Sequence, residues 1–278
     1  MDRLSLDVNG CFDPAAGGLA RADLDALAPA AKAAFEGFEA RRRAGEIGFA
    51  DLPKDAAAAE AAVRLAKELA GRFENLLLLG IGGSSLGGRA IVSALCHPFH
   101  NLLPRERRGA MRVFFPDNTD PSTFEALIGT LDLAETCFAT VTKSGGTAET
   151  MSQHLALRER CIGRFGEEGY RERCVLVTDP AKGALRAIAQ AERLRALSVP
   201  ASVGGRFSAL SAVGLLPAAA AGADVPTLLA GAASLEARCR TGSLRENPAL
   251  LLAAALHLLD VRKGRHVHVL MPYADGLR

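Results

Sequence analysis

An apolar run that breaks into glycines and serines constrains this chain more than any other stretch. Four leucines at 76–79 lead into the turn 80–85, and a helical pattern begins at Leu86. Such runs indicate buried strands of a parallel sheet. Glycines let backbone N–H groups approach a ligand, and the following helix points its positive end at the same place. The turn is therefore either an anion site, most simply for a phosphate, or a purely structural turn.

Two better-known glycine loops do not fit this stretch. A dinucleotide-binding fingerprint needs a third glycine where Ser85 stands, and a nucleotide P-loop needs lysine and a hydroxyl residue after its last glycine. Gly87 is followed instead by Gly88 and Arg89. Neither nucleotide motif is present.

Composition excludes several classes of partner. The net charge of +2 is too small for a nucleic-acid surface, and tryptophan is absent, so we expect no nucleic-acid partner. The start of the chain lacks the pattern of a secretory signal. The uncharged run 207–223 contains Gly214 and Pro217 and indicates a buried helix rather than a membrane span. Six scattered cysteines without a C-x-x-C pair indicate reduced thiols and no metal site. We therefore expect a cytoplasmic protein with no membrane partner.

Helical and strand patterns alternate in the middle of the chain. Residues 23–43 and 56–72 are helical, and five strands follow at 76–79, 112–115, 137–141, 174–177 and 197–199, with helices between them at 86–95, 123–130, 148–165 and 183–193. This alternation predicts an α/β fold: a flavodoxin-like, parallel five-stranded sheet in the order 2-1-3-4-5, with helices on both faces and N-terminal helices before it. Further helices at 209–221, 225–239 and 248–263 precede a strand-like run at 266–271.

The densest polar cluster follows the third strand. Residues 142–147 read Thr142, Lys143, Ser144, Gly145, Gly146, Thr147 and combine three hydroxyls with a lysine and two glycines. Ligands of open α/β sheets bind beyond the carboxyl ends of the strands at the switch point, which strands one and three flank in this order. The location favours phosphate binding. The alternative is that Ser144 or Thr147 caps the next helix.

Two charged residues permit two interpretations each. Arg206, in a glycine turn, is either a surface arginine or a ligand for an oxyanion. Glu149 either takes a minor part in proton transfer or stabilises the start of its helix.

Three segments carry a family resemblance. Residues 80–87, 143–150 and 205–215 resemble, in this order, segments of the glucose-6-phosphate isomerase (phosphoglucose isomerase) family. Residues 247–249 and 271–273 look like the segment that leads into the family's second sugar-isomerase domain. The resemblance runs from about residue 72 to the end and implies the N-terminal portion of such an enzyme.

The resemblance implies a function and a site. The family interconverts glucose 6-phosphate and fructose 6-phosphate through a cis-enediolate without a metal or organic cofactor. Arg206 would stabilise the enediolate, and Thr142 stands where the family often has serine. The sugar phosphate would be held by Gly83, Ser84, Thr142, Lys143, Ser144, Gly145, Gly146 and Thr147.

The resemblance also implies what this chain lacks. The family's glutamate base, and its ring-opening histidine and lysine, belong to the second domain and have no counterpart here. We expect an N-terminal helical segment (1–72), a first sugar-isomerase domain (73–205), and a helical connection with the first strand of an incomplete second domain (206–278). Little activity of this chain alone, and a homodimer of the full-length protein, are expected. A non-catalytic sugar-phosphate-binding module and an isomerase of another phosphosugar remain alternatives.

Overall fold

The computed structural model describes residues 4–277 and divides them into two compact units. The smaller unit comprises residues 4–50 and 230–271, and the larger one residues 51–229 and 272–277. The boundaries expected at residues 72 and 205 follow a change of sequence pattern and stay a prediction.

The larger unit is built on a five-stranded, all-parallel sheet in the order β2-β1-β3-β4-β5. This order confirms the predicted flavodoxin-like α/β fold, and β1 and β3 pair from Asn75↔Thr136 to Leu79↔Thr140. The strands are β1 (Asn75–Leu79), β2 (Arg112–Phe114), β3 (Thr136–Val141), β4 (Cys174–Thr178) and β5 (Arg195–Ser198).

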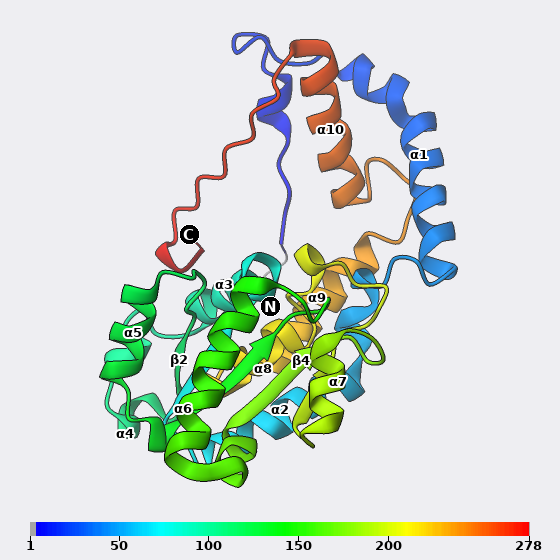
Figure 1. Cartoon of the computed structure of the whole chain (residues 1–278). Helices are drawn as coiled ribbons and strands as arrows, with labels where there is room; N and C mark the ends of the chain where they lie inside the picture. The colour runs from blue at the N-terminus through cyan, green and yellow to red at the C-terminus, as the bar shows by residue number, and fades with distance from the viewer. Residues whose placement is uncertain (1–3, 278) are drawn as a thin grey trace. The chain divides into compact units, whose positions relative to one another are not determined.

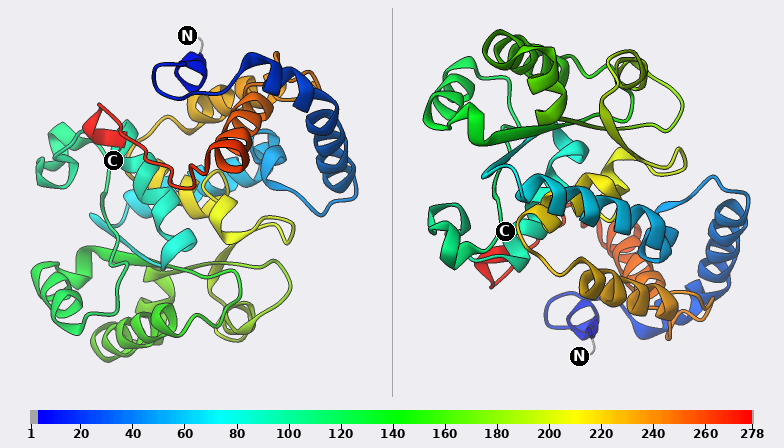
Figure 2. Two further views of the ribbon diagram at one scale, coloured as in Figure 1. Left: turned by 90° about the horizontal axis from the view of Figure 1, so that it is seen from above. Right: turned by 90° about the horizontal axis from the view of Figure 1, so that it is seen from below.

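Helices cover both faces of the sheet (Figures 1 and 2). One face packs on α5 (Pro121–Thr130), α6 (Ala148–Arg173) and α7 (Ala184–Ala191). The other lies against α2 (Ala56–Ala70), α3 (Leu86–Leu95) and α8 (Ala212–Ala220). Because both faces are covered, all five residues of β1 are buried. Double burial explains why this strand is a continuous leucine run rather than an alternating pattern.

Local sequence signals set several helix boundaries. Asp120 accepts hydrogen bonds from the backbone N–H groups of Ser122 and Thr123, and Pro121 occupies the first position of α5. Helix α6 was expected to end near residue 165, and a break in helical geometry does occur at Gly166, whose φ is 73°. The helix resumes after this residue and continues to Arg173.

The smaller unit packs α1 (Arg21–Arg43) against α10 (Pro248–Lys263) around Leu24, Ala254 and Leu258. Asn247 caps α10 by accepting a hydrogen bond from the N–H of Leu250. Helix α9 (Val225–Arg238) crosses the boundary between the units. The remaining elements are η1 (Asn9–Phe12), η2 (Phe49–Lys54), η3 (Gly82–Ser84), η4 (His100–Leu102), α4 (Arg105–Arg108), η5 (Leu133–Glu135), η6 (Gly205–Phe207) and η7 (Asp275–Leu277).

The strand expected at residues 266–271 does not form. These residues are extended but unpaired, and Leu270 is 93% exposed. A β-strand needs a neighbour to satisfy its backbone N–H and C=O groups, and none lies beside this segment in the described chain. The apolar pattern was therefore insufficient to predict a strand here.

Within residues 4–277, no helix is long and apolar enough to cross a membrane. The same residues bring together no group of three or more His, Cys, Asp or Glu side chains suited to a metal ion.

A buried histidine lies between β3 and α6. His154 Nδ1 is 2.8 Å from Thr140 Oγ1, and its Nε2 is 3.4 Å from the Tyr170 hydroxyl. Burial disfavours the charged imidazolium and lowers the pKa of His154 to about 4. The neutral ring belongs to the core of the larger unit.

This histidine predicts a loss of stability in acid. The unfolded chain binds a proton on His154 near pH 6.5, whereas the folded chain resists protonation down to about pH 4. The free energy of unfolding is therefore expected to fall by up to about 3 kcal/mol as the pH drops through this window. Urea unfolding at several pH values measures it. The dependence of the unfolding free energy on pH should weaken in His154→Gln. It should persist in His268→Gln, which changes an exposed histidine. An unchanged pH dependence in His154→Gln would contradict a lowered pKa of His154.

Candidate functional site

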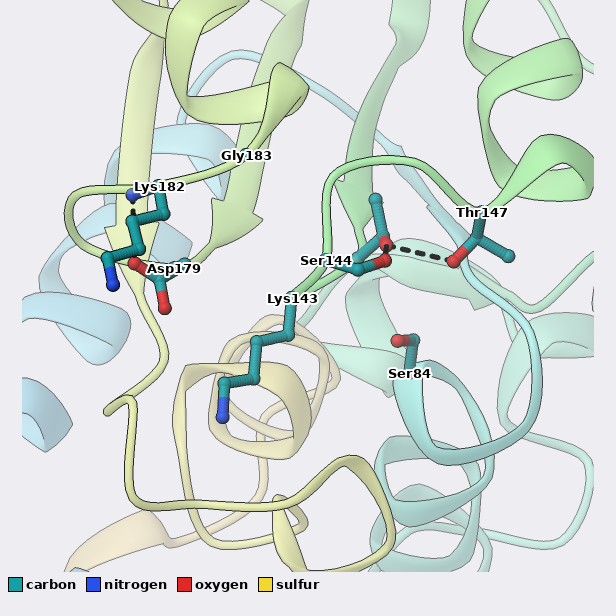
Figure 3. Close-up of a pocket in the computed structure, with 8 residues that line it drawn as sticks. Ser84, Lys143, Ser144, Thr147, Asp179, Lys182 and Gly183 are labelled. Atoms are coloured by element: carbon teal, nitrogen blue, oxygen red, sulfur yellow. Dashed lines mark hydrogen bonds between the residues drawn. The ribbon is translucent and has the colours of Figure 1, made fainter.

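An open pocket of about 450 Å³ lies at the carboxyl ends of β1, β3 and β4 (Figure 3). Parallel strands bring the loops that follow them to one edge of the sheet, so segments far apart in sequence meet there. The lining residues are Ser84, Thr142, Lys143, Ser144, Thr147, Asp179, Lys182 and Gly183.

Hydroxyl groups gather on one side of this pocket. Thr142 Oγ1 lies 3.0 Å from Thr147 Oγ1 and 3.3 Å from Ser144 Oγ. Figure 3 shows the Ser84 side chain below this group, on the turn that follows β1. These four hydroxyls can donate to the oxygens of one anion.

Helix α6 begins at this cluster without a side-chain cap. Thr147 is its N-cap residue, yet its side chain accepts no hydrogen bond from the first turn. The Thr147 hydroxyl contacts Thr142 instead, and Ser144 Oγ accepts only a long hydrogen bond, 3.4 Å, from the N–H of Gly146. The capping alternative is thus not realised, and the first-turn N–H groups are left for an anion.

Two glycines fit the polar loop against the start of α7. Gly145 has a φ of 72°, and a Cβ there would lie 2.7 Å from the backbone nitrogen of Leu185. Gly183 has a φ of 93°, and its Cβ would lie 2.7 Å from the carbonyl oxygen of Ser144. Both positions require glycine for conformation and for space.

A third glycine joins the turn after β1 to the loop that carries Arg206. A Cβ on Gly83 would lie 2.4 Å from the carbonyl oxygen of Gly205. Ser208 Oγ lies 2.7 Å from that oxygen and 3.2 Å from the carbonyl oxygen of Gly83. The loop of Arg206 is thereby held against the turn that carries Ser84.

Some residues expected at the site lie beside the pocket rather than in its lining. Arg206 is exposed and makes no hydrogen bond or ion pair with residues 4–277. Glu149 is exposed in the first turn of α6. Gly83, Gly145 and Gly146 shape the loops without lining the pocket.

The Lys143 side chain is already engaged. Its Nζ donates hydrogen bonds to the carbonyl oxygens of Ala201, at 2.6 Å, and Val203, at 2.8 Å. In Figure 3 it extends away from the hydroxyl cluster. Lys143 still lines the pocket, but two backbone carbonyls hold its ammonium group.

Sequence reasoning missed the contribution of the loop after β4, which supplies Asp179, Lys182 and Gly183. The Asp179 carboxylate accepts hydrogen bonds from the N–H groups of Ala181 and Lys182, both at 2.9 Å. These bonds lower the pKa of Asp179. The signal was available, because β4 was predicted beside β3 and its loop therefore had to open onto the same edge.

The fold and pocket define an α/β domain with a hydroxyl-lined pocket at the switch point of its sheet. Residues 65–278 match the model of the family described as phosphoglucose isomerase. The chain belongs to the phosphoglucose isomerase family.

Named relatives agree with this assignment, and a solved structure shares the fold. Glucose-6-phosphate isomerase of Carboxydothermus hydrogenoformans is 39% identical over 99% of this chain and 60% of its own length. That of Rubrobacter xylanophilus is 43% identical over 94% of this chain and 59% of its own length. A crystal structure from Thermus thermophilus, titled a hypothetical protein, superimposes with a TM-score of 0.76 at 36% identity, over 84% of this chain and 54% of that one. The chain thus spans about 60% of the length of these two curated relatives.

The contact at Gly83 gives a test of the site's geometry. Gly83→Ala should displace the loop of Arg206, because the new methyl group meets a backbone carbonyl that cannot rotate away. We expect faster amide exchange over residues 202–208 and a lower melting temperature. Gly163→Ala is the control, because Gly163 lies in a helix and has open space around its Cβ position. It should leave the amide exchange of residues 202–208 unchanged and keep the melting temperature or raise it slightly. Equal exchange in the two variants would contradict the close approach.

Proposed function

We propose that this chain supplies the phosphate-binding part of an aldose–ketose isomerase that interconverts glucose 6-phosphate and fructose 6-phosphate. The observation that carries the proposal is the uncapped start of α6 beside clustered hydroxyl groups. Membership of the phosphoglucose isomerase family supports the reaction and its substrates.

The phosphate would bind at the hydroxyl cluster. Its oxygens accept hydrogen bonds from Ser84, Thr142, Ser144 and Thr147 and from the first-turn N–H groups of α6, whose dipole favours the negative charge. The glycines at 83, 145 and 146 allow the loops to approach closely enough. These groups hold the substrate by the end that does not react.

Arg206 would act at the other end of the sugar. Moving a proton between C2 and C1 places negative charge on the enediolate oxygens, and a fixed guanidinium beside them lowers the barrier. Arg206 suits this role because no described residue neutralises it and its loop is anchored on Gly83. Glu149 would have at most a minor part in proton transfer.

The pocket lining offers a poor base. Asp179 is the one carboxylate among the described lining residues, and its hydrogen bonds to the backbone lower its pKa. A general base works best with a pKa near the operating pH. We therefore propose that the 278-residue chain by itself binds sugar phosphate and turns it over very slowly, with no metal or organic cofactor.

Two further proposals rest on family membership. The full-length protein would be a homodimer, and it would work in the cytoplasm on soluble sugar phosphates. Neither involves nucleic acid or a membrane.

Removing one hydroxyl tests the phosphate site. Thr147→Val keeps the shape of the side chain and deletes one donor, so the affinity for glucose 6-phosphate should fall about tenfold. Titration calorimetry measures it, with inorganic phosphate and free glucose as comparison ligands. Thr130→Val, which loses only a hydroxyl bonded to Ala126 on α5, should bind normally. Equal binding of glucose and glucose 6-phosphate would contradict a phosphate site.

The reaction itself is tested on the purified chain and on the full-length protein. A coupled assay should give turnover at least about 100-fold slower for the chain alone, since it lacks a well-placed base. Glucosamine 6-phosphate is the comparison substrate. Preferential turnover of the amino sugar would point to another phosphosugar isomerase, and a full-length protein that binds without turnover would point to a binding module.

A further inference from the structure

We propose that Lys143 is a positioning residue, which fixes the loop of Arg206 through two backbone carbonyls and does not serve chiefly as a phosphate ligand. The inference rests on the proposed function, because it concerns the same substrate site. It departs from the role that family resemblance implies for this lysine.

The first support is the geometry of the ammonium group. Lys143 lies in the loop after β3, and its Nζ reaches the carbonyl oxygens of Ala201 and Val203, 58 and 60 residues along the chain. Hydrogen bonds from an ionised donor are stronger than those between neutral groups. With two bonds made, one N–H of the ammonium remains for any other acceptor.

The second support is the turn that receives these bonds. The N–H of Val203 donates to the carbonyl oxygen of Pro200 at 3.0 Å, and the Val203 side chain is buried. This turn points the carbonyl groups of residues 201 and 203 at one place, where their partial negative charges gather. A cation at that place stabilises the turn, and a neutral side chain without a donor would remove this link between the turn and the loop after β3.

The third support is the path from this turn to Arg206. Val203 lies only a few residues before the arginine, and on the far side Ser208 anchors the chain to Gly83. Arg206 therefore sits between two anchors, one on the loop after β3 and one on the turn after β1. Loss of the Lys143 anchor would leave the approach to Arg206 held from one side.

Lys182 provides a matched control. It lines the same pocket and carries the same charge, but no hydrogen bond joins its ammonium group to another described residue. Replacing either lysine by methionine removes one positive charge near the bound phosphate. Only the change at Lys143 removes the contact with residues 201 and 203.

The first measurement follows the loop directly, in the full 278-residue chain. Hydrogen–deuterium exchange of a peptide covering residues 199–206 should accelerate about tenfold in Lys143→Met and stay unchanged in Lys182→Met. Lys143→Arg should restore protection, since a guanidinium can also donate to both carbonyls. Unchanged exchange in Lys143→Met would overturn the proposal. Because this arm needs no ligand, it stands even if phosphate binding fails.

The second measurement separates positioning from phosphate binding. The probes are inorganic phosphate and 6-phosphogluconate, whose carboxylate puts negative charge where an enediolate would carry it. Lys143→Met should lower phosphate affinity no more than Lys182→Met does, yet it should abolish most of the extra affinity for 6-phosphogluconate, as Arg206→Gln is also expected to do. A roughly tenfold greater loss of phosphate affinity in Lys143→Met than in Lys182→Met would make Lys143 a phosphate ligand and overturn the proposal. Failure of the unmodified chain to bind either probe would count against the proposed function alone.

Discussion

The candidate site depends on one close approach of backbone to backbone, that of Gly83 to Gly205. No side chain fits between these segments, since even a methyl group on Gly83 would lie 2.4 Å from a carbonyl oxygen. This contact brings a turn that follows the first strand against a loop far later in the chain. The single hydroxyl proton of Ser208 lies within reach of both carbonyl oxygens, at 2.7 Å from Gly205 and 3.2 Å from Gly83, and links the two segments. In the proposed function, this contact would set the distance between the bound phosphate and the guanidinium of Arg206.

The parallel sheet places the remaining loops of the pocket. Strands β1, β3 and β4 are neighbours and run in parallel, so their following loops open onto a single edge. Gly145 and Gly183 allow the loops after β3 and β4 to pack so closely that a Cβ at either position would clash with the backbone of the other loop. Rigid loops matter for an anion site, because donors fixed before the ligand arrives need not be ordered on binding. The pocket is therefore a property of the sheet's edge more than of any single loop.

The sequence predicted the sheet well because its strongest signals are local. Runs such as residues 76–79 and 174–177 are long and apolar enough to indicate buried strands, and Pro248 marks where the predicted helix 248–263 starts. The hydroxyl cluster was predictable for the same reason, since residues 142–147 are contiguous. The partners of Lys143 were not predictable, because a lysine's contacts depend on loops that meet only in three dimensions. The segment 266–271 shows the opposite failure: its pattern suits a strand, but a strand also requires a neighbour that no local pattern reveals.

That same segment has a consequence for how the isolated chain behaves at high concentration. Residues 266–271 run as an open, extended segment in Figure 1, and their backbone groups pair with no strand among residues 4–277; Val267, Val269 and Leu270 are largely exposed. An unpaired, apolar, extended segment of this length is a template for intermolecular β-pairing. The colloidal stability of the chain would then be limited by this short stretch, remote in sequence from the pocket loops, and not by the folding of the sheet. A soluble preparation would need the stretch to be masked, whereas the pocket itself would need no such protection.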